Sequence, residues 1–313
     1  MAQYLKIPLQ SPFKFYKQLA DPGIHFDDNW FYHQIKPFEV KKQYFQKWEK
    51  QNTTTFQIIS TILPSKVVAY NLQRQPIADF LWTDVATGAA GEKVYECTID
   101  FTAVAINQYW KDNIYFLAFE ATLLSIDWRY ISEPIWLKAQ GGWPNTQLIQ
   151  YWSDGNDLGP IFTTGYKPYF RVECGITDFQ PGRERSSFTD QLHDVETLSA
   201  MPYREYKWSI GHKDGVPPWV MDLMNRISCC KFVKIAGKQY ETTDGSKWDI
   251  ARQKGYPMIW GSIDITEAVN MLSLEDTAES IYPGIVIGYN YETGGFFGGA
   301  NNVIGVQDEE IIN

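Results

Sequence analysis

Apolar and polar residues alternate in short stretches along much of the chain, which is the pattern of half-buried β-strands. In the clearest stretch, 93–101, every second residue from Tyr95 to Phe101 is apolar. Residues 114–124 are apolar almost without a break, which fits a strand covered on both faces and also fits a buried helix. Further strands are predicted at 53–63, 66–71, 169–174 and 203–210.

One segment has the period of a helix instead. Val220, Leu223, Met224 and Ile227 are three or four residues apart and would form a single apolar stripe. Two prolines precede the stripe, and proline is tolerated in the first turn of a helix. The pattern therefore predicts one amphipathic helix over 217–228.

Turn residues divide the rest of the second half of the chain. The run 231–242 predicts a hairpin with Ala236-Gly-Lys as its turn. Residues 181–187, Pro-Gly-Arg-Glu-Arg-Ser-Ser, predict a polar loop. The last 30 residues carry seven glycines, a composition that is poor for a core and typical of a flexible or exchanged arm.

Composition favours the same fold class. Aromatic residues make up 16% of the 313 residues, beside 23 glycines and 16 prolines, and this mixture favours strands and turns. We therefore predict a mostly β protein with β-sandwich-like domains and one conspicuous helix, with an α+β fold as the alternative. Four parts are expected: an irregular amino-terminal arm at 1–50, a β-rich domain at 51–164, a second β-rich domain with the helix at 165–270, and an acidic glycine-rich segment at 271–313.

The net charge of −9 argues against nucleic acid as a partner, since phosphate binding needs a basic surface. No lysine or arginine follows Lys254, whereas nine acidic residues do, so residues 1–254 are balanced. The acidic 255–313 stretch is either a solvated segment or an arm that docks on a basic patch of a neighbouring subunit. For the second case the candidate contacts are Lys41, Lys42 and Lys47 on one side and Glu309 and Glu310 on the other.

The sequence contains neither a secretory-type leader nor an apolar run of 18 residues, so we expect cytoplasmic synthesis and no membrane insertion. Cys97, Cys174, Cys229 and Cys230 are expected to be reduced and to behave as small buried hydrophobes, because none has the spacing of a zinc site.

Motifs of catalysis are absent from the sequence. There is no G-x-S-x-G, no H-E-x-x-H, no protease cysteine signature and no glycine-rich phosphate loop. We therefore predict that the protein is not an enzyme and holds no cofactor or metal. A glycoside hydrolase is the remaining catalytic alternative, because that chemistry needs two carboxylates. The candidates near tryptophans are Asp100, Glu120, Asp127 and Glu133, which equally fit the solvent face of an aromatic-rich sheet.

Large aromatic side chains also occur in turn-rich sequence. Trp143 follows two glycines, and Tyr151 and Trp152 precede Ser-Asp-Gly. Such residues suit a subunit interface or the face of a sugar, because they offer much contact area for few rotamers. They also suit the core at the end of a β-sandwich, so core, interface and ligand platform are all open.

From Ser132 to about Ile265 the sequence resembles a family of uncharacterised proteins encoded by phages and prophages of Bacteroidetes, among tail and baseplate genes. The most specific part is the run G-V-P-P-W…N-R-I, followed by a short cysteine-bearing hairpin. The segments that carry the resemblance are Ser132-Glu-Pro-Ile, Gly155-Asn-Asp-Leu-Gly-Pro-Ile-Phe, Phe170-Arg-Val-Glu, Pro202-Tyr-Arg, Gly215-Val-Pro-Pro-Trp-Val-Met-Asp-Leu-Met-Asn-Arg-Ile, Ile235-Ala-Gly-Lys-Gln-Tyr and Gly255-Tyr-Pro-Met.

This resemblance implies a structural protein of the virion, located in a tail or baseplate ring and in contact with its own copies and with other tail proteins. One alternative is a carbohydrate-binding module that reads a surface glycan as the receptor-binding part of the tail. That alternative predicts that Trp143 and Trp152 are exposed beside one groove.

Overall fold

The computed structural model describes residues 3–19, 44–88, 91–104, 106, 113–156, 159–189, 195–243, 245–254, 258–267, 288–290, 295–298 and 302–305. The chain divides into two compact units, 1–267 and 268–313. Strands dominate and the described residues contain a single α-helix, which confirms the mostly β fold expected from the sequence.

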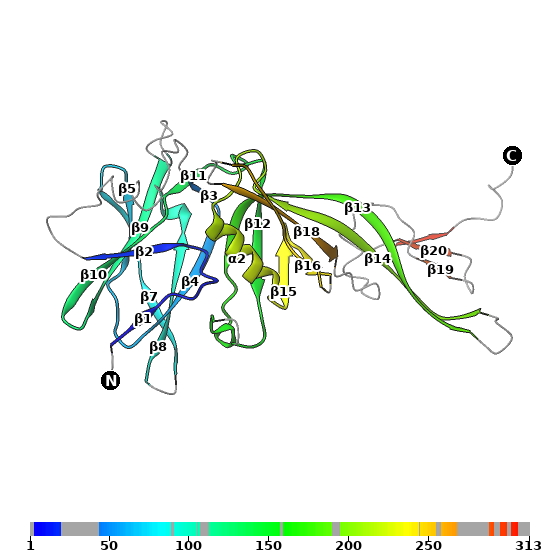
Figure 1. Ribbon diagram of the computed structural model, residues 1–313, viewed down its shortest axis with the longest axis horizontal. Helices are drawn as coiled ribbons and strands as arrows, with labels where there is room; N and C mark the ends of the chain where they lie inside the picture. Colours follow the sequence, from blue (N-terminus) through cyan, green and yellow to red (C-terminus); the bar gives the residue numbers. More distant parts are fainter. Residues whose placement is uncertain are drawn as a thin grey trace. The chain divides into compact units, whose positions relative to one another are not determined.

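Two sheets enclose one core in the amino-terminal part of the first unit and form a β-sandwich (Figure 1). One sheet is antiparallel, in the order β1 (Leu5–Lys6), β4 (Thr53–Ser60), β8 (Lys93–Asp100) and β7 (Trp82–Thr87). The other runs β2 (Phe15–Leu19), β10 (Ile126–Ser132), β9 (Ile114–Leu123), β11 (Ile135–Lys138) and β3 (Gln46–Glu49), with β5 (Val67–Asn71) on β9 and β6 (Pro76–Phe80) on β5. Strands β3 and β11 pair in parallel.

Alternation along the strands builds the core of the sandwich. Tyr95, Cys97 and Ile99 of β8 are buried, as the period-two pattern predicts, and Phe101 follows them in the short 3₁₀ turn η1 (Phe101–Ala103). The apolar run at 114–124 is a strand, with one face in the sandwich core and the other partly covered. A buried helix was the other interpretation of that run, and it is excluded.

The seven strands of a third sheet follow. They are β12 (Thr146–Trp152), β13 (Tyr169–Thr189), β14 (Val195–Ile210), β15 (Phe232–Ile235), β16 (Lys238–Thr242), β17 (Asp249–Arg252) and β18 (Ile259–Glu267), with the 3₁₀ turn η3 (Phe162–Thr164) after β12. Six strands pair in a circle, β12–β13–β14–β18–β16–β15–β12, and β17 adds to β18. We call this circle the closed sheet.

The expected boundary at 164/165 does not coincide with the sheets. β12 lies on the amino-terminal side of that boundary and pairs with both β13 and β15. Tyr44, from a stretch expected to be an irregular arm, packs in the core of the closed sheet. The boundary between the two β-rich parts depends on which strands pair over long distances in the chain, and local composition carries no information about that pairing.

The predicted helix is α2 (Pro218–Ser228), with Pro217 as its N-cap residue and Pro218 in its first turn. Its stripe, Val220, Leu223 and Met224 among others, is buried in the core of the closed sheet. The predicted hairpin is β15–β16.

The sequence prediction for 181–187 is wrong. This polar stretch is not a loop but continues β13, which runs without interruption to Thr189. Residues 175–189 find backbone partners along β14, and those partners are set by long-range register.

In the second unit, three short strands form an antiparallel sheet: β19 (Gly288–Asn290), β20 (Gly295–Gly298) and β21 (Asn302–Gly305).

Candidate functional site

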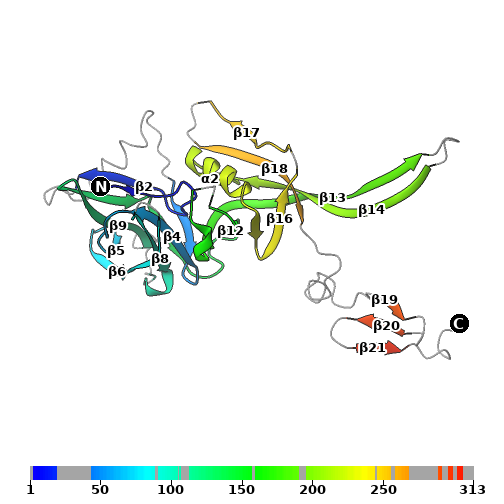
Figure 2. The same ribbon diagram turned by 90° about the horizontal axis from the view of Figure 1, so that it is seen from below.

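A two-stranded ribbon formed by β13 and β14 projects from the closed sheet (Figures 1 and 2). The ribbon consists of residues 181–189 of β13 and 195–204 of β14, which pair from Pro181–Arg204 to Thr189–Val195. At about 3.3 Å per residue it is roughly 30 Å long. Among the described residues, β12 pairs with β13 only as far as Glu173, and β18 pairs with β14 only from Glu205 onward. Both outer edges of the ribbon are therefore unpaired in the described part of the chain.

A β-bulge marks the base of the ribbon. The register of β13 against β14 shifts between Thr177 and Gln180, and Asp178 has a positive φ of 54°. Such a bulge bends its strand and increases the local twist. Phe179, within the bulge, packs its ring 5.5 Å from the ring of Tyr206. The bulge thus directs the ribbon away from the sheet at the point where β18 stops pairing.

Large apolar side chains are exposed on and beside the ribbon. Phe179 and Phe188 are 55% and 56% exposed, and no other phenylalanine of the described residues is exposed to this degree. Tyr203 is 39% exposed, and its ring lies over Gly182, where an added Cβ would come within 2.4 Å of it. Aromatic groups in these positions add contact area to any strand or surface that meets the ribbon.

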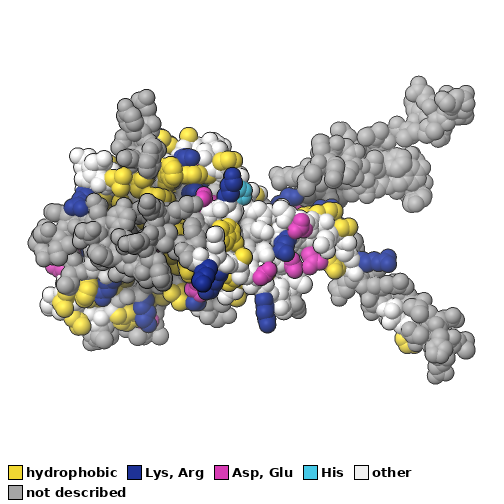
Figure 3. All heavy atoms as spheres, turned by 45° about the horizontal axis from the view of Figure 1, so that its top comes forward, with side chains coloured by type: hydrophobic (Ala, Val, Ile, Leu, Met, Phe, Trp, Pro, Cys, Tyr) yellow, Lys and Arg dark blue, Asp and Glu magenta, His cyan; other side chains and the backbone are white. Residues whose placement is uncertain are grey.

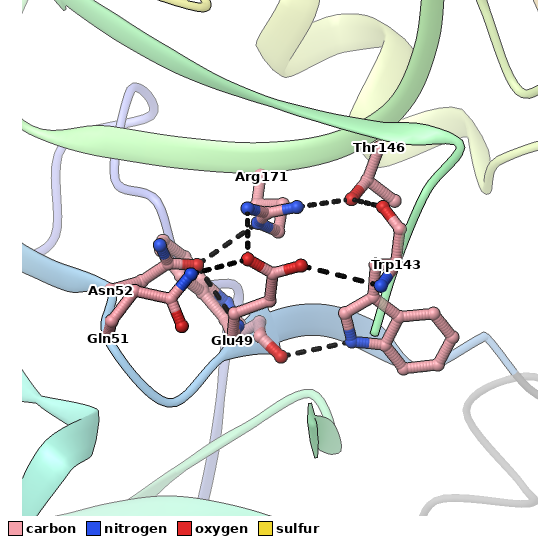
Figure 4. Close-up of polar contacts among 7 residues, drawn as sticks. Glu49, Gln51, Asn52, Trp143, Thr146 and Arg171 are labelled. Atoms are coloured by element: carbon pink, nitrogen blue, oxygen red, sulfur yellow. Dashed lines mark hydrogen bonds and ion pairs between the residues drawn. The ribbon is translucent and has the colours of Figure 1, made fainter. Parts of the chain in front are cut away.

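Of the residues predicted from the sequence, Trp143 is half-buried and held in place by its neighbours (Figure 4). Its indole Nε1 donates to the carbonyl of Trp48 at 3.0 Å, and its backbone N donates to Glu49 Oε1 at 3.4 Å. Its ring meets Trp136 edge-on, with centroids 4.9 Å apart. Trp143 is thus part of the structure that joins the sandwich to the closed sheet.

Beside Trp143 lies a buried polar network around Arg171 of β13 (Figure 4). The guanidinium donates to Asn52 Oδ1 at 3.0 Å, to Thr146 Oγ1 at 2.6 Å and to Glu49 Oε2 at 2.8 Å. Glu49 is itself 4% exposed, so the ion pair has little water around it. Burial lowers the pKa of Arg171, and the Glu49 carboxylate opposes that shift. This network connects the two β-rich parts through charge-assisted hydrogen bonds.

Lys47, another predicted residue, forms an ion pair with Glu173, and its ammonium lies 5.2 Å from the Trp143 ring centroid. Lys138 lies over the same ring at 3.7 Å. Burial and the neighbouring Lys47 lower the pKa of Lys138. The ammonium groups of Lys47 and Lys138 thus form a cation–π cluster with the Trp143 indole where the sandwich meets the closed sheet.

Tyr151 and Trp152 are adjacent in β12 and point to opposite faces. Tyr151 is fully buried, and its hydroxyl donates to the carbonyl of Gln10, so it belongs to the core and not to an exposed platform. Trp152 is half-buried and stacks on Phe232 at 4.9 Å and 16°. Lys167 lies over the Trp152 ring at 4.9 Å. The period of two in a strand explains why only one of the two residues reaches the surface.

Trp143 precedes β12 and Trp152 ends it, so the strand separates them by about 20 Å. Both side chains are half-buried, whereas the carbohydrate-binding alternative predicts that they are exposed. The other candidate contacts, Lys41, Lys42, Glu309 and Glu310, lie outside the described residues.

The four candidate carboxylates for glycoside cleavage have separate partners. Asp100 accepts from the backbone N of Thr102, Glu120 pairs with Arg129, and Asp127 accepts from the hydroxyl of Thr122. Glu133 is buried and accepts a hydrogen bond from Tyr16.

A cavity with a volume of about 340 Å³ lies between the end of α2 and strands β14, β15, β16 and β18. Trp208, Val233 and Tyr240 are among its lining residues, together with Cys229 and Cys230. A smaller cavity, of about 140 Å³, lies between residues 7–15 and α2. Neither of these two cavities is lined by a carboxylate from the glycosidase candidates or by Trp143 or Trp152.

Three of the four cysteines are buried, as expected, and Cys229 is exposed. Burial raises the pKa of the Cys230 thiol to about 12, and that of Cys174 likewise to about 12. No group of three or more His, Cys, Asp or Glu side chains in the described residues has an arrangement suited to a metal ion.

On the face shown in Figure 3, basic and acidic side chains are interspersed, without a continuous basic stripe. Within the described ranges, no helix has the length and apolar character needed to cross a membrane.

Comparison with known proteins adds no relative: no family model, no curated protein and no solved structure matches the chain.

Sequence reasoning missed the ribbon, because 181–187 is polar and contains Pro181 and Gly182. The available signal was the combination of this stretch with residues 195–204, which mix polar and apolar side chains and follow it at a spacing that permits a hairpin.

Proposed function

We propose that the chain is a structural subunit of a phage tail or baseplate assembly, in which copies of the protein contact one another. The observation that carries the proposal is the projecting ribbon of β13 and β14. A two-stranded ribbon without a covering core is marginally stable in water, and long free edges invite pairing with other chains. A subunit that is built into a larger assembly covers such edges.

The resemblance to phage tail and baseplate proteins supports the same proposal. The stretch from Ser132 to Ile265 that carries it includes the closed sheet, α2 and the ribbon. An assembly role needs rigid packing and accessible contact surfaces, and it needs no catalytic group. The buried Arg171 network supplies rigidity, and Phe179 and Phe188 supply accessible apolar surface.

The first test is the mass of the purified full-length chain by light scattering over a range of concentrations, with negative-stain images of the same fractions. Closed rings or stacked rings are expected. A mass of one chain at every concentration would contradict self-assembly. Antibodies against the protein are further expected to label the tails of phage particles that encode it, and labelling of heads alone would contradict the tail assignment.

A matched pair of variants tests the contribution of the ribbon. Phe179→Lys with Phe188→Lys removes exposed apolar side chains beside and on the ribbon and is expected to lower the assembled fraction. Leu63→Lys with Leu81→Lys changes side chains that are 68% and 74% exposed elsewhere, and assembly is expected to persist. An equal loss of the assembled fraction in both double variants would show that the wild-type protein associates through any exposed apolar side chain, and not specifically through the ribbon.

The stack of Trp152 on Phe232 favours a second candidate function, the binding of a surface glycan by the tail. Half-buried flat rings flanked by lysines suit the face of an acidic sugar. Glycan binding should then quench tryptophan fluorescence and disappear in Trp152→Ala, while Trp136→Ala retains it. Absence of binding to any member of a broad glycan array would dispose of this candidate.

A further inference from the structure

We infer that the ribbon of one copy pairs edge to edge with the ribbon of the next copy, β13 against β14, so that the ribbons of neighbouring subunits form one continuous antiparallel sheet. This inference rests on the proposed function and names the partner of the ribbon, a second copy of this chain.

Two prolines define which backbone groups face outward. Pro181 is opposite Arg204, and Pro202 is opposite Arg183. Proline has no N–H, so a ladder accepts it where the nitrogen points away from the paired strand. The two pairs are two residues apart along the ribbon and therefore have the same orientation. Both prolines therefore indicate the same register. In this register the backbone N–H and C=O groups point outward at residues 181, 183 and 185 of β13 and at residues 200, 202 and 204 of β14.

This register also accounts for the end of the closed sheet. β18 pairs with β14 only from Glu205 onward, and Pro202, whose nitrogen faces the same edge, cannot donate to a third strand. Pro181 has the same effect on the edge of β13. Beyond the prolines, the described segments 183–189 and 195–201 contain no further proline, so their outward N–H and C=O groups are available for pairing.

The direction of the strands identifies the partner. β13 and β14 are antiparallel, so the two edges of one ribbon run in opposite directions. When a second copy is related to the first by rotation about an axis along the ribbon, its β13 lies antiparallel to the β14 of the first copy. Every neighbouring pair is then antiparallel, and the contact joins two different edges. Such a heterologous contact closes into a ring when the rotation closes.

The two edges available for pairing are also matched in length, since 183–189 and 195–201 contain seven residues each. Pairing them extends a marginal two-stranded ribbon into a sheet of many strands, which satisfies the free backbone groups.

Two proline substitutions test the inference in the full-length protein. Arg185→Pro removes an outward N–H from β13, and Ala200→Pro, at the position opposite, removes one from β14. Each is expected to weaken self-association about tenfold or more, from the lost hydrogen bond and the steric block to a neighbouring strand. Arg185→Ala and Ala200→Gly keep the N–H groups and are expected to assemble like the wild type.

A third variant checks the register itself. Glu184→Pro removes an N–H that points into the ribbon, so it is expected to reduce the protection of the ribbon from hydrogen exchange. Arg185→Pro and Ala200→Pro should retain that protection within one molecule. If they lose it as Glu184→Pro does, the assignment of outward groups is wrong.

Mixing the two edge variants identifies which edges meet. Each variant keeps one free edge, so an equimolar mixture is expected to form dimers at concentrations at which each variant alone is monomeric. Assembly of one edge variant alone, with loss in the other, would show pairing between identical edges and would overturn the inference.

The proposed function and the edge pairing fail differently. A wild-type protein that never assembles contradicts the proposed function. A wild-type protein that assembles, together with edge variants that assemble equally well, contradicts the edge pairing alone.

Discussion

Arg171 is buried between the sandwich and the closed sheet, and its three guanidinium nitrogens reach Glu49 at the end of β3, Asn52 between β3 and β4, and Thr146 at the start of β12. A buried ion pair adds little net stability when compared with apolar residues of the same shape. Removal of one partner is different, because it leaves the Glu49 carboxylate buried without its counter-charge. Substitution of Arg171 alone is therefore expected to destabilise the folded protein strongly.

We expect Arg171→Ala to lower the free energy of unfolding by about 3–5 kcal/mol. The double change Arg171→Met with Glu49→Gln is expected to recover part of that loss, because no charge is left in the site. Lys231→Ala breaks an ion pair with Asp154 whose side chains are both more than 60% exposed, and it should change stability by at most about 1 kcal/mol. Denaturant titration measures all three, and equal effects of the two single changes would contradict this role of Arg171.

Glu133 makes the fold sensitive to pH. Burial raises the pKa of this carboxyl from 4.5 to about 7, against the opposing hydrogen bond from Tyr16 and the charge of Lys14. Its Oε2 has no hydrogen-bond partner among the described residues. The folded protein thus binds this proton more tightly than the unfolded chain, so the resulting stability is complete below pH 4.5 and is lost as pH rises through 7.

For this group alone, the free energy of unfolding is expected to fall by about 2–3 kcal/mol between roughly pH 5 and pH 8. The Glu133→Gln variant cannot ionise at this position, so its stability should lack that fall when compared with the wild type at each pH. Chemical denaturation at both pH values measures the difference. Parallel pH profiles for the two proteins would show that Glu133 does not titrate in this range.

At the scale of the element, the β15–β16 hairpin has a turn whose sequence fits its geometry only in part. Ala236 and Gly237 both have positive φ, 51° and 88°, as a type I′ turn requires. Glycine adopts such angles freely, whereas alanine is strained by roughly 1–2 kcal/mol. Ala236 is exposed, so its side chain contributes little packing in return.

Ala236→Asn is therefore expected to raise the free energy of unfolding by about 0.5–1 kcal/mol, since asparagine tolerates this conformation better. Gly237→Ala should destabilise the protein, although an added Cβ would meet no atom within 4 Å, because the strain is in the backbone alone. Thermal unfolding of both variants is the measurement, and a stabilising Gly237→Ala would refute the assigned turn.

At the scale of the whole molecule, the two β-rich parts of the first unit share contacts beyond the Arg171 network. Thr54 of β4 accepts from the backbone N of Tyr169 at 3.0 Å and donates to its carbonyl at 2.7 Å. Gln57 accepts from the backbone N of Ile161 at 2.8 Å. Such buried polar contacts across a junction favour cooperative unfolding of both parts.

The native cysteines report on this cooperativity. Cys97 is buried in the sandwich and Cys174 in the closed sheet. Pulsed alkylation with mass spectrometry in increasing denaturant is expected to expose both thiols at the same midpoint. In Arg171→Ala we expect the two midpoints to separate. Separate midpoints in the wild type would mean that the two parts unfold independently.

Much of the fold was predictable from the sequence, because local patterns record burial. Alternation at 93–101 identified β8, and the stripe from Val220 to Ile227 identified α2. The candidate site was predictable only in part. Trp152 reaches the surface, whereas its neighbour Tyr151 is buried, and the alternation of a strand could have separated the two.

Sequence alone determined the fold class, the helix and several strands, since period-two and period-3.6 patterns follow directly from which side chains leave water. Tertiary structure decided the rest. Arg171 meets Glu49 across more than 120 residues of chain, and β12 joins the closed sheet through partners on both sides. The ribbon is a strand pair only because register aligns 181–189 with 195–204, and polar residues carry no local signal of that register.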